Sequence, residues 1–255
     1  MKETIIEKLK DIEEIENIKI IYAVESGSRA WGFAGTDSDY DVRFIYVRNK
    51  DFYLKLEPTR DVIEYPINDL LDISGWDISK TMRLAHNSNP SLYEWLQSPI
   101  IYKEDNIVNK LRELFKEYFS VNKISRHYYH MAENQDYKYI KNHKEVKVKK
   151  YFYLLRPILS AKYVLDYKDV PPIEFDKLRQ IITPKNINEI IDNLLKIKKN
   201  SEETQLIQKN QELDQYIENT FINVKNEIEL LPKEKEKSWD LLNEEFKKVI
   251  ATGYL

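Results

Sequence analysis

Two aspartates follow a cluster of glycines near the beginning of the chain. The 255-residue chain contains only five glycines. Three of them fall within nine residues, namely Gly27, Gly32 and Gly35. Asp39 and Asp41 come shortly after this cluster. Since glycine allows sharp turns and close approach of the backbone to a ligand, the cluster predicts a specialised loop in front of the aspartate pair.

The spacing of the two aspartates predicts a cation site. In a strand, side chains two positions apart point to the same face, and two carboxylates on one face repel each other unless a cation lies between them. Hard divalent ions such as Mg²⁺ take oxygen ligands and bridge to phosphates. The turn at Gly27 and Ser28 offers backbone N–H groups and a hydroxyl to an anion. Together these groups predict a nucleoside triphosphate site.

Two expected strands position these groups. Residues 18–24 are apolar and β-branched, which predicts a buried strand, and residues 39–47 predict a second. On the second strand the face opposite the aspartates suits a core, with Tyr40, Val42, Phe44 and Tyr46. In the alternative interpretation, Asp37, Ser38 and Asp39 form a polar turn into an edge strand and the glycines serve that turn. A strand on each side of the Gly-Ser and Asp-x-Asp motifs favours the ligand site.

These residues resemble a known family pattern. A Gly-Ser pair followed about ten residues later by Asp-x-Asp resembles the signature of the DNA polymerase β nucleotidyltransferase superfamily. The closer resemblance is to the RlaP-like predicted nucleotidyltransferases of RNA repair. It rests on the segments GSRAWG, SDYDVRFIY, DISGWDISK, SNPSLYEWLQSPIIY and KKYFYLLRPILSAKY. The similarity is dense over residues 22–102 and returns at 126–175.

The resemblance implies catalysis with Mg²⁺, or Mn²⁺, by a two-ion mechanism. Asp39 and Asp41 match the metal-binding pair, and Gly27 and Ser28 match the turn that grips the triphosphate. The superfamily adds a third carboxylate on a later strand, for which the candidates are Asp69, Asp72 and Asp77.

Asp72 is the preferred third carboxylate. It stands alone among apolar residues at 70–73, which a strand tolerates best when the acid faces a metal. Asp77 follows Gly75-Trp76 and precedes a helical pattern, so it suits a helix N-cap, and it is the second choice. Asp69 lies at the polar entrance of the expected strand.

Three cations are candidates for neutralising phosphate charge. Arg29 lies beside the Gly-Ser turn, and Arg43 lies two residues beyond the aspartate pair. An intramolecular pair between Arg43 and Asp41 is an equally supported alternative. Lys150 matches the KKY…LRP stretch of the family, and its alternative is a solvated basic face on a packed helix.

A basic and aromatic segment at residues 122–168 suggests an RNA partner. It holds 11 Lys or Arg against 4 Asp or Glu, and 8 of the 18 tyrosines, in a chain of net charge −3. Such a segment favours a polyanion. The alternative is compositional bias, because Lys, Asn, Ile and Tyr are frequent along the whole chain.

Length and composition bound the remaining possibilities. The absence of cysteine excludes disulfides, zinc–thiolate sites and thiol nucleophiles. No run of 18 apolar residues predicts a membrane span, and the charged N-terminus does not resemble a secretion signal, so a cytoplasmic protein is expected. The expected fold is α+β, with a small mixed nucleotidyltransferase sheet and flanking helices in residues 1–102, followed by an all-helical domain in residues 103–255.

The predicted function is transfer of a nucleotide from a nucleoside triphosphate to a hydroxyl acceptor, with an RNA end favoured. Two alternatives stay open at this point. One is nucleotidylation of a protein or small-molecule hydroxyl, as in toxins or antibiotic-resistance enzymes. The other is a non-catalytic module that binds nucleotide or RNA.

Overall fold

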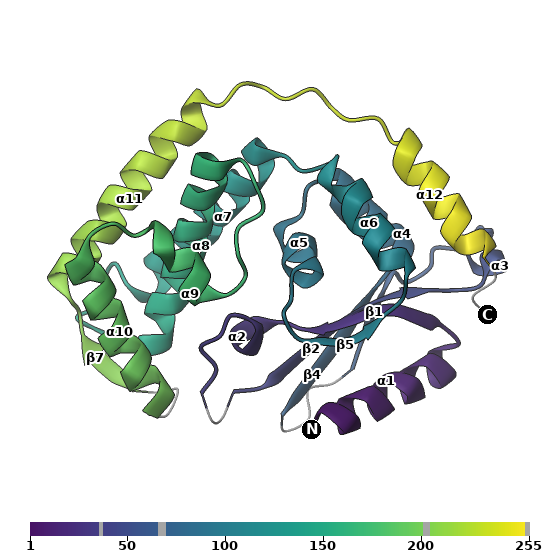
Figure 1. The fold of residues 1–255 in the computed structure, drawn as a ribbon, viewed down its shortest axis with the longest axis horizontal. Coiled ribbons are helices and arrows are strands. Elements are labelled where there is room, and N and C mark those ends of the chain that lie inside the picture. Colours follow the sequence, from purple (N-terminus) through teal and green to yellow (C-terminus); the bar gives the residue numbers. More distant parts are fainter. Residues whose placement is uncertain (36–37, 66–69, 201–204, 253–255) are drawn as a thin grey trace. The chain divides into compact units, whose positions relative to one another are not determined.

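The computed structural model describes residues 1–35, 38–65, 70–200 and 205–252. A five-stranded sheet in the order β3-β4-β2-β1-β5 is the central element of the N-terminal half (Figure 1). Its strands are β1 (Lys19–Glu25), β2 (Tyr40–Val47), β3 (Val62–Glu64), β4 (Leu71–Asp77) and β5 (Ile101–Glu104). The pair β2–β4 is parallel and the other pairs are antiparallel. The sheet is therefore mixed, which confirms the predicted α+β class.

Helix α1 (Lys2–Glu16) covers one face of this sheet. Its buried residues Ile5, Leu9 and Ile12 recur at helical spacing and pack in one core with the apolar side chains of the strands. On β2 that core includes Val42 and Phe44. Because side chains alternate along a strand, the odd-numbered residues of β2 project from the opposite face. Asp41 and Arg43 are among them.

Gly75 lets β4 lie close to this core. A Cβ at Gly75 would come within 2.1 Å of the Phe44 ring, so any larger residue would displace the ring. Phe44 and Gly75 are direct partners in the parallel β2–β4 pairing. The glycine thus sets the packing of the strand that carries Asp72.

The remaining helices of the N-terminal half are short, and most begin with a clear cap. Asn89 and Asn49 each accept a hydrogen bond from a backbone N–H of the helix that follows. Pro90 occupies the first helical position, where its lack of an N–H costs nothing. These helices are α2 (Gly27–Ala30), α3 (Lys50–Tyr53), α4 (Ile78–His86), α5 (Pro90–Leu96) and α6 (Ile107–Lys116).

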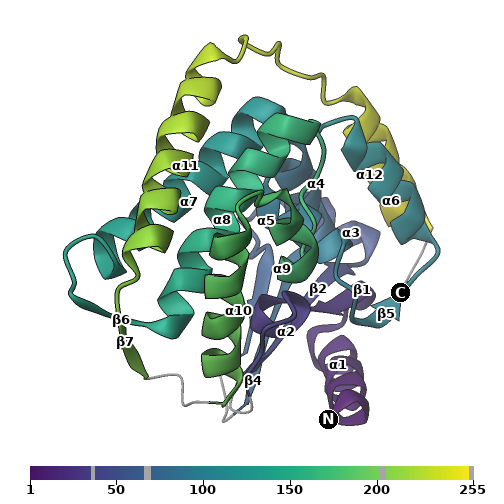
Figure 2. The same ribbon diagram turned by 60° about the vertical axis from the view of Figure 1, so that its left-hand side comes forward.

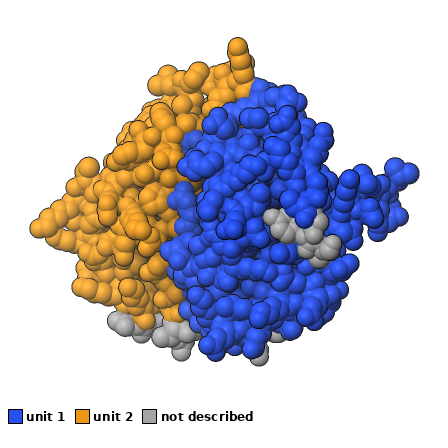
Figure 3. All heavy atoms as spheres, turned by 45° about the vertical axis from the view of Figure 1, so that its right-hand side comes forward, with its two compact units in different colours: residues 1–30, 39–119, 236–255 blue, residues 31–38, 120–235 orange. Residues whose placement is uncertain are grey.

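The chain forms two compact units, and neither is one continuous stretch (Figure 3). Unit 1 contains residues 1–30, 39–119 and 236–255, and unit 2 contains residues 31–38 and 120–235. This division differs from the expected boundary after residue 102. Helix α6 stays with the sheet because Val108, Leu111 and Phe115 are buried there, and Arg112 donates to the Tyr22 hydroxyl at 3.1 Å.

Helix α12 (Asp240–Ala251) also belongs to unit 1. It contacts α4, and the Trp239 ring that precedes it stacks on His86 with ring centroids 3.6 Å apart. His86 Nε2 lies 2.8 Å from the carbonyl oxygen of Lys237. These contacts join residues about 150 positions apart in sequence, which no local pattern predicts.

Unit 2 is built around three long helices that pack side by side (Figure 2). They are α7 (Val121–Tyr139), α8 (Val148–Tyr167) and α11 (Gln211–Leu230). Helix α8 is buried along most of its length and stays helical through Pro157. Shorter elements complete the unit, namely α9 (Phe175–Leu178), the 3₁₀ turn η1 (Arg179–Ile181) and α10 (Lys185–Asn200).

The prediction of an all-helical second domain was wrong in one respect. Strands β6 (Glu145–Lys147) and β7 (Leu206–Gln208) form a small antiparallel ladder in unit 2. Val146 of β6 is buried between exposed neighbours, as a strand with one packed face requires. Each strand has three residues and their partners lie about sixty positions apart, so no hairpin pattern marks them in the sequence.

Residues 31–38 belong to unit 2 because of their aromatic side chains. The Trp31 ring lies 5.6 Å from Tyr153, and the Phe33 ring lies 5.3 Å from Phe152. The backbone N–H of Phe175 donates to the carbonyl of Trp31 at 2.9 Å. Trp31 and Phe33 are thus part of the helical core of unit 2. Across the described ranges, no helix is both long and apolar enough to cross a bilayer.

Candidate active site

The Gly27 turn lies directly against the carboxylate of Asp41. Strand β1 is buried and ends at Glu25, and Gly27 then adopts a left-handed φ of 59° to start the single turn of α2. A Cβ at Gly27 would lie 1.9 Å from Asp41 Oδ2. The N–H of Ser26 also donates to the carbonyl of Asp41 at 2.8 Å. Both the conformation and the close approach therefore require glycine, as the sequence predicted.

Asp41 and Asp72 are neighbours across the parallel strands β2 and β4. Their Cα atoms are direct partners in the pairing. The guanidinium of Arg43 bridges them: its Nη2 lies 3.0 Å from Asp41 Oδ1 and 2.6 Å from Asp72 Oδ2. Its Nη1 donates to the carbonyls of Val42 and Asp72, at 3.1 and 2.9 Å. Arg43 thus makes the intramolecular pair that the sequence offered as an alternative to a phosphate contact, and it does so with both carboxylates.

The pKa of Asp41 shows how crowded this cluster is. Burial raises it above the usual aspartate range. The Arg43 guanidinium opposes that rise, whereas the carboxylates of Asp72 and Asp39 add to it. The negative charge on Asp41 is therefore costly chiefly because the side chain is buried, and the Arg43 guanidinium offsets part of that cost. The cation site predicted from the spacing of Asp39 and Asp41 stays a prediction.

Asp39 is exposed at the entrance to β2 and is fixed through its main chain. Its carbonyl accepts a hydrogen bond from Arg29 Nε at 3.0 Å. The guanidinium of Arg29 lies over the Tyr40 ring, 3.7 Å from its centroid. Arg29 also lowers the pKa of Asp41. The structure therefore brings Gly27, Ser28, Arg29, Asp39, Asp41, Arg43 and Asp72 together in unit 1.

The donor set fits a hard divalent cation in its chemistry. Carboxylate oxygens of Asp41 and Asp72 already converge on one positive group, the Arg43 guanidinium, and oxygen is the ligand that Mg²⁺ and Mn²⁺ prefer. Within the described part of the chain, no three carboxylate or imidazole side chains converge as ligands of one ion. Arg43 takes one oxygen from each aspartate, so a metal would have to share or replace that contact.

The other two candidates for the third carboxylate have different outcomes. Asp77 lies at the opposite end of β4 and pairs with Tyr46. It is 1% exposed and caps α4, accepting hydrogen bonds from the Ser79 N–H at 2.7 Å and the Tyr53 hydroxyl at 3.0 Å. The prediction of an N-cap at Asp77 is confirmed. Asp69 lies outside the described residues.

Glu25 is a site residue that the sequence analysis missed. It is fully buried, and its Oε1 accepts a hydrogen bond from the Asp41 N–H at 2.9 Å. Its Oε2 accepts a hydrogen bond from the Tyr102 hydroxyl. Burial raises the pKa of Glu25. The available signal was a lone acid at the end of an apolar strand, immediately before the Gly-Ser turn.

Lys150 lies in unit 2, within a row of two cations and three aromatic rings. Its Nζ is 3.6 Å from the centroid of the Tyr139 ring and 5.6 Å from that of Tyr153. Tyr153 contacts Trp31, and the Arg156 guanidinium lies 4.3 Å from the Trp31 centroid. We call these five residues the cation–aromatic row. Lys150 is thus held by cation–π contacts, and its predicted role at a nucleotide stays a prediction.

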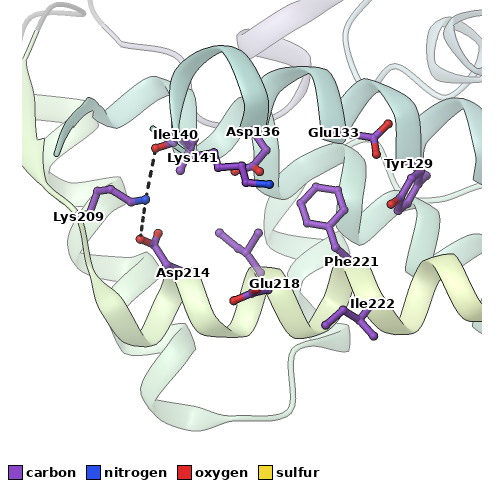
Figure 4. A pocket seen from close by; sticks show the side chains of 11 residues that line it. Tyr129, Glu133, Asp136, Ile140, Lys141, Lys209, Asp214, Glu218, Phe221 and Ile222 are labelled. Atoms are coloured by element: carbon purple, nitrogen blue, oxygen red, sulfur yellow. Dashed lines mark hydrogen bonds and ion pairs between the residues drawn. The ribbon is translucent and has the colours of Figure 1, made fainter. Parts of the chain in front are cut away.

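A pocket of about 340 Å³ lies between α7 and α11 in unit 2 (Figure 4). Four carboxylates line it, namely Glu133, Asp136, Asp214 and Glu218. Lys209 forms an ion pair with Asp214 in this pocket, with Nζ 3.1 Å from Oδ2. The pocket lies partly in the segment 122–168, yet carboxylates outnumber its lysines. Its charge disfavours a polyanion, so this surface is not where RNA is expected to bind.

Comparison with known proteins identifies the family. The chain matches the RNA repair pathway DNA polymerase beta family over residues 1–248. It is 44% identical over 245 residues to the uncharacterized protein YcgL of Bacillus subtilis (strain 168). The matched region covers 95% of this chain and 94% of that protein. A nucleotidyltransferase-like protein from Exiguobacterium sibiricum 255-15 is 14% identical, covering 88% of this chain and 74% of that chain, and its TM-score of 0.31 is too low to support an argument. The resemblance seen in the motifs is confirmed, and the chain belongs to the RNA repair pathway DNA polymerase beta family.

Proposed function

We propose that this nucleotidyltransferase family member transfers a nucleotide from a nucleoside triphosphate to the hydroxyl of an RNA end. The acceptor oxygen forms a bond to the α-phosphorus and the bond to the β-phosphate breaks. The hydroxyl proton passes to solvent and pyrophosphate leaves. The observation that supports this reaction most is the packing of the Gly27 turn on Asp41, with Asp72 alongside.

The turn, the neighbouring Arg29 and the three aspartates each have a role under this proposal. The backbone of the Gly27-Ser28 turn binds the triphosphate, and Arg29 offsets its charge. Asp39, Asp41 and Asp72 would hold Mg²⁺ or Mn²⁺ once the ion shares or replaces the Arg43 contact, and the metal would neutralise charge on the entering and leaving oxygens. Catalysis then depends on positioning and electrostatics, without a covalent nucleophile.

The RNA acceptor is supported by the family and by the cation–aromatic row. The family description names RNA repair. In unit 2, Tyr139 is exposed at the end of the row, and Lys150 lies on its ring. Exposed rings stack on unpaired bases, and nearby cations contact phosphates. This combination suits a single-stranded RNA end better than a protein hydroxyl.

A transfer assay with matched variants tests the proposal. Purified protein with Mg²⁺ or Mn²⁺ is incubated with each α-labelled nucleoside triphosphate and total cellular RNA. Asp41→Asn removes a carboxylate from the cluster, and Asp136→Asn removes one from the α7–α11 pocket as a control. We expect label in RNA with the wild type and the control only.

The other outcomes distinguish the rival functions. Label on protein, or on a small molecule, would replace the RNA acceptor. Metal-dependent binding of the triphosphate without transfer to any acceptor would indicate a non-catalytic module. Transfer that survives Asp41→Asn would contradict the assignment of the site.

A further inference from the structure

We propose that Glu25 is a positioning residue that fixes the main chain of Asp41, and through it the carboxylate that faces the Gly27 turn. This inference rests on the proposed function for its catalytic meaning, but the hydrogen bonds that support it belong to the fold. Glu25 is fully buried, and its two carboxylate oxygens accept hydrogen bonds from the Asp41 N–H and the Tyr102 hydroxyl.

The strand geometry explains why a side chain is needed here. Strand β1 ends at Glu25, and the chain then turns away at Gly27. In the register of β1 and β2, Glu25 pairs with Val42, and the next residue, Ser26, donates its N–H to the Asp41 carbonyl at 2.8 Å. The return bond is not made, because the Ser26 carbonyl accepts from the Ala30 N–H of α2 instead of from the Asp41 N–H. A half-buried N–H without an acceptor is costly. The Glu25 carboxylate accepts that N–H at 2.9 Å and takes the place of the missing ladder bond.

Glu25 is itself held on several sides. The Tyr102 hydroxyl donates to its second carboxylate oxygen. The Ser98 hydroxyl donates to its carbonyl at 2.6 Å, and its own N–H donates to the Ile100 carbonyl at 2.9 Å. With both carboxylate oxygens engaged, Glu25 has little rotational freedom. Glu25 therefore links the main chain of Asp41 to Tyr102 of β5 through its two carboxylate oxygens.

This support acts on the atoms that matter for the site. A Cβ at Gly27 would fall within 1.9 Å of Asp41 Oδ2. At such close approach, a small shift of the Asp41 backbone moves its carboxylate relative to the turn. Residues that orient the ligands of a metal commonly contribute 10- to 100-fold to metal affinity, and that is the effect we expect from Glu25.

The test measures Asp41 and metal binding separately, in the full-length protein. Amide hydrogen exchange of Asp41 is followed by NMR without metal, and binding of Mn²⁺ alone by electron paramagnetic resonance. In Glu25→Ala, we expect Asp41 exchange to accelerate at least about tenfold and Mn²⁺ affinity to fall about 10- to 100-fold. Glu25→Gln retains an acceptor for the Asp41 N–H, so it should stay within about threefold of wild type.

Two further variants distinguish loss of the Glu25 carboxylate contact from a general folding defect. Tyr102→Phe leaves Glu25 in place but frees one of its oxygens, so it should show a smaller change of the same sign. Ser98→Ala removes a bond to the Glu25 main chain and leaves the carboxylate contact, so Mn²⁺ affinity should not change. A folded Glu25→Ala with a protected Asp41 amide and unchanged Mn²⁺ affinity would overturn the proposal. So would a Glu25→Gln that behaves like Glu25→Ala.

Failure of the proposed function gives a different result. If Mn²⁺ binding depends on Asp41 and Glu25 but no nucleotide transfer occurs, the function is wrong and the positioning role stands. If the folded wild type binds no Mn²⁺, the exchange rate of the Asp41 amide in Glu25→Ala and Glu25→Gln alone decides the role of Glu25.

Discussion

Each unit of this protein has a cluster of carboxylates, and the two clusters differ in their surroundings. In unit 1, Asp41 and Asp72 lie side by side on parallel strands, against a glycine turn, and Arg43 bridges them. In the α7–α11 pocket, Asp214 is paired with Lys209, and two helices far apart in sequence supply the walls (Figure 4).

Crowding alone does not separate the two. Burial raises the pKa of Asp41 and of Asp136, and neighbouring carboxylates add to both shifts. What distinguishes the unit 1 cluster is the backbone turn at Gly27, which packs directly against the Asp41 carboxylate. The density of carboxylates is therefore a poor guide to chemistry, and the groups facing them are a better one.

The largest expected effect separates the clusters by activity. Asp41→Asn should lower nucleotide transfer about 10³-fold, because metal ions supply several kcal/mol of charge stabilisation and each 1.36 kcal/mol is tenfold in rate. Asp136→Asn should leave the rate unchanged. Single-turnover rates of both variants with labelled triphosphate check this. Equal losses would mean that the two clusters do not differ in function.

The next effect compares two glycines with positive φ. Gly27→Ala places a Cβ 1.9 Å from Asp41 Oδ2, whereas Gly32, at φ 85°, has nothing within 4 Å of an added Cβ. Gly27→Ala should lower transfer about 10²-fold, as displacements near 1 Å do. Gly32→Ala should cost about 1 kcal/mol of stability from backbone strain and leave the rate of the folded protein intact. Rates and unfolding midpoints measured together decide between strain and displacement.

Arg43 offers a test of charge compensation. Arg43→Met leaves the carboxylates of Asp41 and Asp72 facing each other without a cation between them. The free energy of unfolding, measured with a chelator present, should fall by about 2 kcal/mol. This is less than the loss of about 3–5 kcal/mol on breaking a fully buried ion pair, because these side chains are partly exposed. Added Mn²⁺ should restore part of that loss.

Arg83→Met is the control for Arg43. Arg83 pairs with Asp61 at 2.7 Å, and its side chain is half exposed, so its loss should be small and insensitive to Mn²⁺. Denaturant unfolding with and without Mn²⁺ checks both variants. If Mn²⁺ has no effect on Arg43→Met, the carboxylates of unit 1 do not attract the metal.

A smaller effect concerns RNA binding by unit 2. Lys150→Ala should weaken binding of single-stranded RNA and lower the slope of log K against log salt by about 0.7, the value of one phosphate contact. Lys162→Ala, on the same helix but paired with Asp166 at 2.8 Å, should not change the slope. Titrations at several salt concentrations measure it. An unchanged slope in Lys150→Ala would remove Lys150 from the RNA surface.

The smallest effect is a pH dependence in the pocket. Burial raises the pKa of Asp136 in the folded protein above the usual 3.8. The folded state then binds a proton more readily than the unfolded state, so this group contributes stability as pH falls through its raised pKa and loses it as pH rises. Relative to Asp136→Asn, the wild type should gain less than about 1 kcal/mol on acidification toward pH 4. Unfolding at a series of pH values checks the sign, and a gain at higher pH would contradict it.

The sequence predicted the parts of the site that depend on local order. The turn at Gly27, the strand that carries Asp41 and the capping role of Asp77 each depend on a few neighbouring residues. The strand begins at Tyr40, one residue later than expected, so Asp39 lies just before it. Asp72 required knowledge of a family, because only the parallel pairing of β2 and β4 brings it to Asp41.

What the sequence did not predict depends on tertiary contacts. Glu25 reaches Asp41 because β1 ends one residue short of it, a matter of register that no periodicity reports. The division into units escaped prediction for a similar reason. Trp31 and Phe33 have no local signal that assigns them to helices more than a hundred residues away.

The return of residues 236–252 to unit 1 has a consequence for how the protein matures. Trp239 stacks on His86, and α12 packs on α4, so the sheet unit gains this covering only after the whole of unit 2 has been synthesised. A nascent chain carries the Gly-Ser turn and all three cluster aspartates long before that moment, but its α4 surface is still bare. Completion of unit 1 is thus coupled to the synthesis of residues 236–252, and a chain that stopped after unit 2 would leave the face of α4 that contacts α12 uncovered.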